Sequence, residues 1–341
     1  MAQETAAGTD AGVLARAQGC LLGQLAGDAL GSMVEFKSAA TIRGMYPGGL
    51  REIGPSPVFG TLAGQPTDDS ELALALARTL VAHGFAVEQI AAAYGDWHES
   101  HPFDEGNATR QALCGIGPAR RRGGSAAATA RQSADPQTQA NGALMRQSPL
   151  GIWGYARDPA VLDGYVRADT QLTHPNQVCQ DASAAFIVAL AAVIREGLDG
   201  PAAYARACEW NQAHGHSPKV TQALAAAKTA RPNYEQSIGH VPIALQNAFY
   251  QALHAPSFEV GVVDTVMQGG DTDTNAAIAG ALLGAIHGAA AVPDQWRAAL
   301  LACRPAQSAP GVHRPRPAMY WPLDALDLAA QLLAVGRRAV S

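Results

Sequence analysis

The sequence predicts an all-α fold, and three observations point to it. Apolar residues recur every three to four positions along most of the chain, as on the buried face of a helix. Alanine is abundant, while the alternating β-branched runs that are typical of strands are nearly absent. Several prolines stand where a first helical turn tolerates them. We therefore expect a single-domain orthogonal bundle of roughly ten or more helices.

Helical spacing of apolar residues predicts each long helix in turn. Helices at residues 71–83 and 87–99 are predicted from this spacing without a further signal. The helix predicted at residues 181–196 also contains the longest apolar run of the chain. Three further helices begin at a proline, which is compatible with the first turn of a helix. They are expected at residues 201–213, 242–253 and 322–339, and another at 274–290 follows an acidic turn.

Two helices carry glycine at every fourth position, so that each presents one face without side chains. Each glycine weakens a helix by about 1 kcal/mol relative to alanine. Because several glycines share one face, we expect this cost to be offset by close packing against another helix. We expect the two helices to pack near the core and to carry Glu35 and an acidic cluster at Asp271 toward a common centre. The glycines are Gly19, Gly23, Gly27 and Gly31 in one helix and Gly280, Gly284 and Gly288 in the other.

The remaining segments predict the domain organisation. Residues 123–140 are rich in Ser, Ala, Gln and Thr, and residues 305–317 are rich in Pro and Arg, so both are expected to be loops. Residues 1–14 are expected to form a flexible N-terminal arm, and residues 15–341 a single catalytic domain. The short basic cluster Arg120-Arg121-Arg122 is expected to lie in a solvated loop.

Composition excludes several classes of protein. A net charge of −5 argues against a general nucleic-acid binder. The run at residues 184–194 is shorter than the roughly 20 residues that span a bilayer, and the polar start lacks the apolar core of a signal peptide. Five scattered cysteines without a Cys-x-x-Cys pair are typical of a reducing compartment. We expect a soluble cytoplasmic protein without nucleic-acid or membrane partners.

Two acidic segments, each placed before a helix, combine carboxylates with threonine hydroxyls. They are Thr67-Asp68-Asp69 and Gly269-Gly270-Asp271-Thr272-Asp273-Thr274-Asn275. If folding brings them together, four carboxylates and two hydroxyls form an all-oxygen ligand set that suits Mg²⁺ or Mn²⁺. So many acidic groups in one pocket also require cations or bound protons. The hypothesis is a two-metal site.

Simpler interpretations of these segments exist. Asp and Thr are ordinary helix N-caps, and an Asp-rich turn before a helix often has no other role. The second segment also imitates the start of a calcium loop, which needs Gly at its sixth position and Glu at its twelfth. Those positions hold Ala276 and Leu282, so a calcium loop is excluded.

Six motifs follow one another along the chain and carry a family resemblance. They are Gly27-Asp28-Ala29-Leu30-Gly31 with Glu35, Thr67-Asp68-Asp69-Ser70-Glu71, Pro102-Phe103-Asp104-Glu105-Gly106-Asn107, Asn141-Gly142-Ala143-Leu144-Met145-Arg146, Thr173-His174-Pro175 and Gln268-Gly269-Gly270-Asp271-Thr272-Asp273-Thr274. In this order they resemble the ADP-ribosylglycohydrolase family, closest to its dinitrogenase-reductase-activating and ADP-ribosylarginine-hydrolase branch. The resemblance covers roughly residues 15–300.

The resemblance implies an all-helical hydrolase that uses two Mg²⁺ or Mn²⁺ ions to cleave the N-glycosidic bond between ADP-ribose and arginine. It implies an ADP-ribosylated protein as the substrate. It also implies site residues, in three groups: metal ligands Thr67, Asp68, Asp69, Asp271, Asp273 and Thr274; substrate-binding residues Gly106, Asn107, Thr109, Asn141, Gly142 and His174; and candidate catalytic acids Asp104, Glu35 and Asp68, with Asp104 facing the guanidinium.

The sequence departs from the family pattern at two places. The segment 136–140 lacks the acidic residue expected before Asn141, and His240 stands where an aromatic residue is expected. Both departures affect the expected rim of the pocket and so concern substrate context. One hypothesis is an immunity protein that reverses arginine ADP-ribosylation by a toxin, with the arm blocking that toxin. Alternatives are a hydrolase of another ADP-ribose linkage (serine, ester or nucleic acid) and a non-catalytic scaffold like the lens crystallins of similar fold.

Overall fold

A computed structural model describes the backbone of residues 2–338 and the side chains of residues 11–338. Within these residues the chain forms helices joined by loops, with two isolated β-bridges and no strand. The helices are α1 (Ala2–Gly31), α2 (Ala39–Met45), α3 (Asp68–His83), α4 (Val87–Glu99), α5 (Asn107–Leu113), α6 (Ile116–Arg121), α7 (Ala126–Ser133), α8 (Ser148–Trp153), α9 (Pro159–Thr170), α10 (Gln177–Glu196), α11 (Gly200–His214), α12 (Pro218–Ala227), α13 (Val241–His254), α14 (Phe258–Val266), α15 (Thr272–His287), α16 (Asp294–Ala302) and α17 (Ala325–Arg338), with short 3-10 helices η1 (Leu144–Arg146), η2 (Ala289–Ala291) and η3 (Ala318–Tyr320). The all-α prediction is confirmed.

Helix boundaries follow the sequence signals closely. The helix predicted at residues 87–99 coincides with α4, and α3 begins three residues before its predicted start, directly after Thr67. Helix α15 ends at His287 and not at residue 290, because Gly288 takes the left-handed φ of 79° that terminates many helices. Gly288 therefore ends the glycine-bearing helix and does not belong to its face.

The loop predicted at residues 123–140 is wrong in part, because it contains α7. The Ser125 side chain caps this helix by accepting a hydrogen bond from Ala128 N. The Glu88 carboxylate of α4 accepts a further bond from Ala127 N at 3.1 Å. Three consecutive alanines then supply strong helix formers. The loop predicted at residues 305–317 contains no helix.

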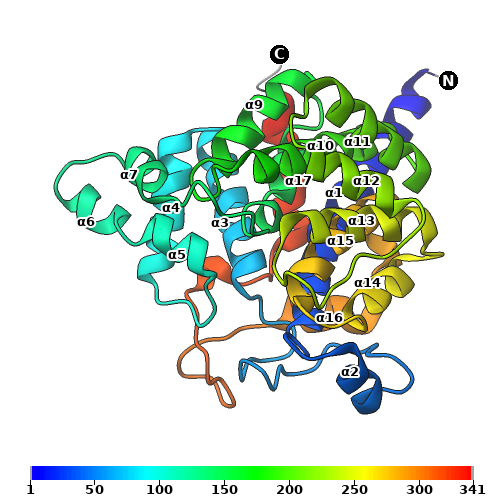
Figure 1. Cartoon of the computed structure of the whole chain (residues 1–341), viewed down its shortest axis with the longest axis horizontal. Helices are drawn as coiled ribbons and strands as arrows, with labels where there is room; N and C mark the ends of the chain where they lie inside the picture. Colours follow the sequence, from blue (N-terminus) through cyan, green and yellow to red (C-terminus); the bar gives the residue numbers. More distant parts are fainter. Residues whose placement is uncertain (1, 339–341) are drawn as a thin grey trace.

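Helices α1 and α15 lie antiparallel at the centre of the bundle (Figure 1) and form its most extensive interhelical contact. A Cβ atom added at Gly23 would lie 2.2 Å from Gly280 O, and one added at Gly19 would lie 2.1 Å from Gly284 O. Only glycine permits backbones to approach this closely. The predicted close contact between the two glycine-bearing helices is confirmed.

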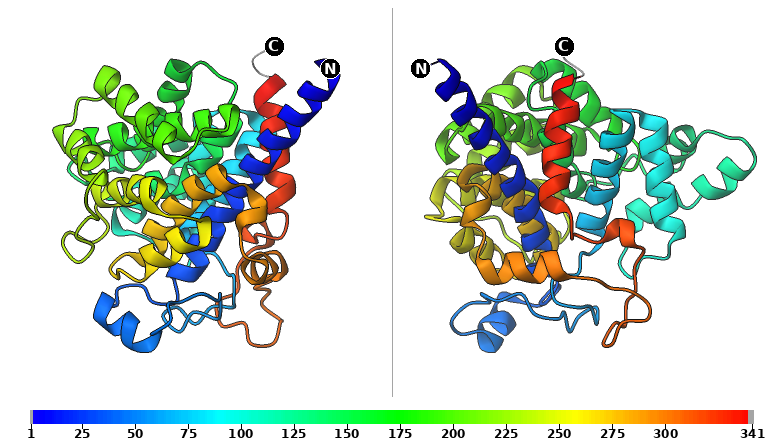
Figure 2. Two further views of the ribbon diagram at one scale, coloured as in Figure 1. Left: turned by 90° about the vertical axis from the view of Figure 1, so that its right-hand side faces the viewer. Right: turned by 180° about the vertical axis from the view of Figure 1, so that it is seen from behind.

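Other helices enclose this central pair. Figure 2 shows α17 beside α1, whereas α4 to α7 form a projecting lobe on the left of Figure 1. Helix α10 is the one helix among residues 2–338 that is long and apolar enough to cross a membrane, but 89% of its most apolar window is buried in the bundle. A core helix has the same properties, so α10 is weak evidence of a membrane span.

The predicted N-terminal arm coincides with the beginning of α1. The side chains of residues 1–10 lie outside the described part, and Val13, near the end of the predicted arm, is buried in the core. The division between an arm of residues 1–14 and a domain of residues 15–341 stays a prediction.

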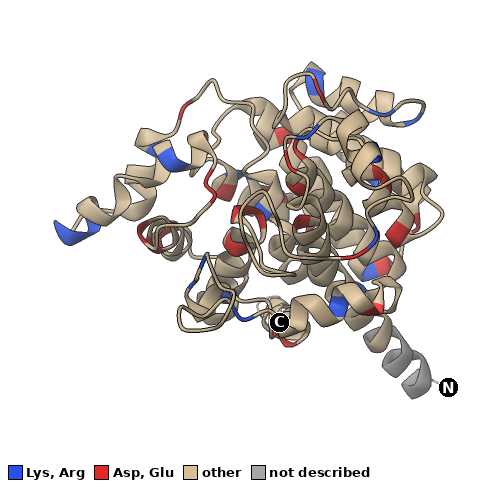
Figure 3. Cartoon of the chain, turned by 90° about the horizontal axis from the view of Figure 1, so that it is seen from below, with Lys and Arg blue, Asp and Glu red and all other residues tan. Residues whose placement is uncertain are grey.

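Basic residues are spread over several elements in the view of Figure 3, on both helices and loops. Arg120 and Arg121 end α6, and do not lie in the loop predicted from the sequence. They pair with Asp96 and Glu99 of α4. The basic cluster is therefore an exposed, ion-paired helix end.

Candidate active site

The acidic segment that opens α3 is held by a carboxylate of α1. The Thr67 hydroxyl does not cap its own helix but donates to Asp28 Oδ1 over 2.9 Å. Asp28 also accepts hydrogen bonds from the backbone N–H groups of Thr67 and Ser70, each at 3.2 Å. Burial raises the pKa of Asp28 to about 7, although these hydrogen bonds oppose the shift. Because Asp28 caps α3, the carboxylates of Asp68 and Asp69 remain available to the cavity.

The acidic segment that opens α15 follows two glycines in the left-handed region, with φ of 77° at Gly269 and 75° at Gly270. A Cβ atom on Gly270 would lie 2.4 Å from Tyr234 O, so this turn requires glycine. The Thr272 hydroxyl donates to Gly31 O over 2.7 Å and ties the turn to the end of α1. Asp271 accepts a 2.7 Å hydrogen bond from Asn141 Nδ2.

The two acidic segments meet, although they lie far apart in the chain. Thr274 Oγ1 donates to Asp69 Oδ2 over 3.3 Å and joins positions 205 residues apart. Phe36 N donates to Gly270 O over 2.8 Å, which places Glu35 beside the α15 turn. Carboxylate oxygens of Glu35, Asp271 and Asp273 lie within 4.8 Å of one another.

The carboxylates in this cluster fit a hard divalent cation. Glu35 Oε2 and Asp69 Oδ1 are buried and have no hydrogen-bond partner among the described residues. A buried carboxylate oxygen without a partner is costly, and a cation or a proton removes the cost. Because carboxylates and hydroxyls provide only oxygen ligands, the donor set suits Mg²⁺ or Mn²⁺.

Burial and mutual repulsion raise the pKa values of these acids. Burial, followed by the charges of Asp271 and Asp68, raises the pKa of Glu35 to about 9. Burial, followed by the charges of Asp68 and Glu35, raises the pKa of Asp104 to about 10. Burial also raises the pKa of Asp68 to about 6. Without a cation, the cluster therefore holds protons at neutral pH.

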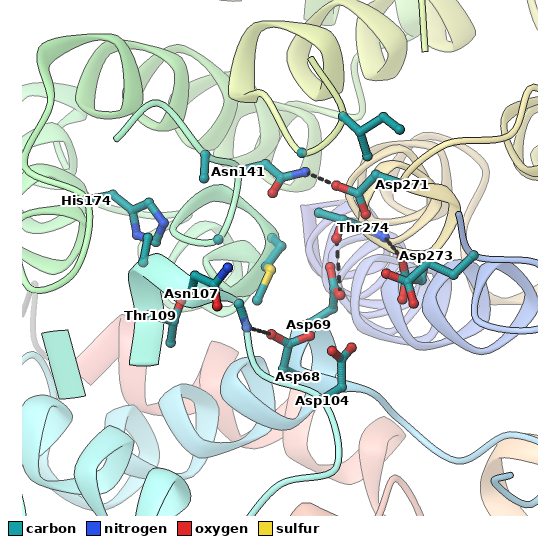
Figure 4. Close-up of a pocket in the computed structure, with 18 of the residues that line it drawn as sticks. Asp68, Asp69, Asp104, Asn107, Thr109, Asn141, His174, Asp271, Asp273 and Thr274 are labelled. Carbon is teal, nitrogen blue, oxygen red and sulfur yellow. Dashed lines mark hydrogen bonds between the residues drawn. The ribbon is translucent and has the colours of Figure 1, made fainter. Parts of the chain in front are cut away.

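The acidic cluster forms one side of a cavity of about 370 Å³, within the range of small-molecule sites. Asn107, Thr109, Asn141 and His174 lie along the other side (Figure 4). A Cβ atom on Gly142 would lie 2.9 Å from His174 Cε1, so glycine keeps this part of the wall open. The cavity therefore joins an anionic end to a wall of amide, hydroxyl and imidazole groups.

Comparison with known proteins identifies the family. The model of the ADP-ribosylglycohydrolase family matches residues 9–330, nearly the whole chain. The chain belongs to the ADP-ribosylglycohydrolase family. The resemblance inferred from the six motifs is thus confirmed, and the enzymes of this family act on ADP-ribosylated proteins.

Two named relatives and one solved structure illustrate the similarity. The chain is 31% identical over 283 residues to the ADP-ribosyl-[dinitrogen reductase] glycohydrolase of Rhodospirillum rubrum, covering 82% of this chain and 88% of that protein. It is 29% identical over 304 residues to the ADP-ribosylarginine hydrolase Tri1 of Pseudomonas putida, covering 83% of this chain and 73% of that protein. A solved structure titled ADP-ribosylglycohydrolase-related protein complex matches with a TM-score of 0.74 at 27% identity, covering 95% of this chain and 99% of that one.

Almost every site residue predicted from the sequence of this family member lines the cavity. The exception is Thr67, which lies behind the wall and contacts Asp28 and Asp69. The individual roles of these residues stay predictions. The predicted residues that line the cavity are Glu35, Asp68, Asp69, Asp104, Gly106, Asn107, Thr109, Asn141, Gly142, His174, Asp271, Asp273 and Thr274.

Sequence reasoning missed several lining residues. Some adjoin a predicted motif, as Phe36 adjoins Glu35, and their position next to it is a usable signal. Ile238 and Gly239 lie next to His240, the residue expected at the rim, and a hydrogen bond of 2.9 Å from Asn141 N to Gly239 O brings their loop to the cavity. The missed residues are Phe36, Ala108, Thr138, Ala140, Met145, Ile238 and Gly239.

The two places where the sequence departs from the family pattern contact each other. His240 Nε2 lies 2.9 Å from Gln139 Oε1, which also accepts a 2.7 Å hydrogen bond from Lys219 Nζ. An isolated bridge pairs Ala140 with His240 next to Asn141. The two departures therefore form one polar contact beside the cavity, which Lys219 joins through Gln139.

Proposed function

We propose that this ADP-ribosylglycohydrolase releases ADP-ribose from modified arginine side chains with the help of two Mg²⁺ or Mn²⁺ ions. The observation that carries the proposal is the convergence of the α3 and α15 carboxylates with Glu35 on one side of a single cavity. Two acidic segments without a shared ligand would have no reason to meet around unpartnered carboxylate oxygens.

Six oxygen-bearing residues would hold the ions. Five of them line the cavity, and the sixth, Thr67, lies behind the wall in contact with Asp69. When bound, such ions polarise a water molecule and lower its pKa, which makes it a nucleophile near neutral pH. The chain positions these ligands through contacts outside the ligand set, since Asp28 fixes Thr67 and Asn141 orients Asp271. The six are Thr67, Asp68, Asp69, Asp271, Asp273 and Thr274.

We assign the recognition of arginine to Asp104. It lies at the cavity beside Asp68, and after burial the charge of Asp68 contributes to raising the pKa of Asp104. A carboxylate binds a guanidinium group through two parallel hydrogen bonds, a geometry that an ester or an ether does not offer. Because the pKa of Asp104 is raised to about 10, its carboxyl group holds a proton until a cationic guanidinium lowers that pKa. Asp104, Glu35 and Asp68 are the candidate acids for delivering a proton to the departing guanidine nitrogen. A carboxylate of Asp104 that pairs with the guanidinium has no proton to give, so in that state the proton must come from Glu35 or Asp68.

The opposite wall binds the rest of the ADP-ribose. Asn107 and Asn141 present amide groups, and Thr109 presents a hydroxyl group, to the cavity. Such groups donate hydrogen bonds to phosphate and ribose oxygens without adding charge. Gly106 and Gly142 let the ligand approach the backbone.

Release of ADP-ribose from an arginine-ADP-ribosylated protein tests the proposal. We expect release with Mg²⁺ or Mn²⁺, none with a chelator, and none from the Asp271→Ala, Asp273→Ala double variant. Glu52→Ala changes an exposed carboxylate that does not line the cavity, and it serves as the matched control. Absence of release from the folded wild-type protein with either metal would refute the proposed activity.

Asp104→Ala separates arginine from other linkages. We expect this variant to lose turnover of arginine-linked substrate by about 100-fold, within the usual range for a positioned proton-transfer group. Unchanged turnover would contradict the arginine assignment and favour another ADP-ribose linkage. If calorimetry detects no Mg²⁺ or Mn²⁺ binding to the wild-type protein, a non-catalytic scaffold becomes the better interpretation.

We further propose a setting in the cytoplasm as an immunity protein against an ADP-ribosylating toxin. Five free cysteines are compatible with a reducing compartment, and the relative Tri1 is named an ADP-ribosylarginine hydrolase. Co-expression with an arginine-specific ADP-ribosyltransferase toxin tests this setting, with and without residues 1–14. Failure of both forms to protect the cells would contradict it.

A further inference from the structure

A buried arginine lies behind the wall that carries His174. Arg146 is fully buried, and its Nε and Nη2 atoms both donate to Asp169 Oδ2 over 3.3 Å. The ring centroid of Tyr94 lies 4.4 Å from the guanidinium carbon. The remaining terminal nitrogen, Nη1, donates to Thr173 Oγ1 over 2.9 Å. Arg146 is thus held on several sides, and it faces the Thr173 hydroxyl group.

The direction of the next hydrogen bond follows from these contacts. Arginine has donors only, so Thr173 Oγ1 must accept from Arg146. The one other partner of this hydroxyl among the described residues is His174 Nδ1, at 2.7 Å. Because a buried O–H without an acceptor is costly, the hydroxyl proton points to Nδ1. Nδ1 is then an acceptor, and the ring proton of a neutral imidazole must reside on Nε2.

Nε2 lies where a ligand can reach it. His174 lines the cavity, and among the described residues its Nε2 has no hydrogen-bond partner. A Cβ atom added at Gly142 would lie 3.1 Å from Nε2 and 3.1 Å from Thr109 Oγ1, so the absence of a side chain at Gly142 leaves space in front of the ring. In Figure 4, His174 lies at the end of the cavity away from Asp273.

We propose that Arg146 and Thr173 are positioning residues that hold His174 as the neutral Nε2–H tautomer, which donates to an acceptor atom of the bound ligand. The tautomer stands on the contacts of the protein alone, whereas the donor role rests on the proposed function. Burial, and then the charge of Arg146, lowers the pKa of His174 to about 3, so the ring stays neutral. A neutral donor contacts phosphate, ribose or ring-nitrogen acceptors without neutralising the acidic end of the cavity.

Nuclear magnetic resonance of histidine-¹⁵N-labelled, ligand-free protein tests the tautomer. The signals of His174 are assigned by their loss in His174→Gln. We expect an unprotonated Nδ1 and a protonated Nε2 in the wild type and in Thr173→Ser, which keeps the hydroxyl group. Thr173→Val, of nearly the same shape, should shift both signals toward a mixture of tautomers.

Thr170→Val is the matched control, because Thr170 is equally buried and its hydroxyl group bonds to Gln147. Its hydrogen bond with His174 runs from His174 N to the backbone oxygen of Thr170 over 2.8 Å, and valine keeps that bond. It should leave the His174 signals in place. A protonated Nδ1 in the wild type, or an unchanged spectrum in Thr173→Val, would overturn the proposal.

Calorimetry with ADP-ribose tests the donor role separately. Loss of one positioned hydrogen bond should raise the Kd of Thr173→Val about tenfold, while Thr173→Ser and Thr170→Val stay within about twofold of the wild type. Wild-type affinity in Thr173→Val would overturn the donor role. If ADP-ribose does not bind the wild type, the proposed function and the donor role both fail, and the spectrum still decides the tautomer.

Discussion

Substitution of Gly23 by alanine tests the close contact of α1 and α15 most directly. The added Cβ atom would lie 2.2 Å from Gly280 O and 3.0 Å from the Phe258 ring, whereas ordinary van der Waals contact begins at 3.4 Å. The shortfall against Gly280 O is therefore 1.2 Å. That atom belongs to the backbone of a buried helix, so no side-chain rotation relieves the overlap. The two helices must separate locally, or the bundle must deform.

The expected change in the unfolding free energy of Gly23→Ala is the sum of two opposing effects. Overpacking a core costs about 1–3 kcal/mol, and a clash between rigid backbones belongs at the upper end of that range. Alanine in place of glycine returns about 1 kcal/mol of helix propensity. The expected net loss of unfolding free energy for Gly23→Ala is about 2 kcal/mol. Gly164→Ala is the matched control, because Gly164 is exposed on the surface of α9, with no atom beyond its own helix backbone and chain neighbours within 4 Å of an added Cβ. It should gain about 0.5–1 kcal/mol.

Urea denaturation followed by circular dichroism measures both variants, with equal m-values required for the comparison. The predicted difference between the two variants is about 3 kcal/mol, the sum of the loss at one site and the gain at the other. A Gly23→Ala protein as stable as Gly164→Ala would refute the argument that glycine is needed for the helix contact.

Three further predictions concern pH, a buried ion pair and the metal. Because the pKa of His174 is lowered to about 3 from an ordinary 6.5, the unfolded chain binds a proton at this histidine before the folded protein does as the pH falls. The unfolding free energy of the wild type should therefore fall by about 2 kcal/mol between pH 7 and pH 5, measured by denaturation at each pH, and His174→Gln should not show this loss. Arg316→Met leaves the Glu71 carboxylate buried without its 2.8 Å partner and should cost about 3–5 kcal/mol of unfolding free energy. Arg51→Met, at an exposed ion pair, should cost less than about 1 kcal/mol, and equal losses would contradict this reasoning. Mn²⁺ at about 100 times its Kd should stabilise the wild type by about 2.7 kcal/mol in thermal unfolding, and a similar gain in Asp273→Asn would argue against Asp273 as a ligand.

Much of the fold could be predicted from local patterns. The helices predicted at residues 87–99 and 274–290 were inferred from apolar periodicity, a pattern that each segment shows without reference to the rest of the chain. The residues of the candidate site were also predictable, because carboxylates and hydroxyls before helices, together with six ordered motifs, indicate a chemistry. Helix α7 was missed, because its short alanine and serine stretch has no apolar face long enough to distinguish it from a loop.

Local patterns in the chain suffice to show that it is helical, which helices have glycine faces and which side chains are candidate oxygen ligands. Packing was needed to show that Asp28 caps α3, that Arg316 pairs with Glu71, and that Arg146 reaches His174 through Thr173. The difference lies in the range of the interactions. Periodicity and capping act within a few turns of one helix, whereas most of these contacts join distant segments that only packing brings together. Each such pairing depends on the positions of whole helices, and no local pattern in the chain records it.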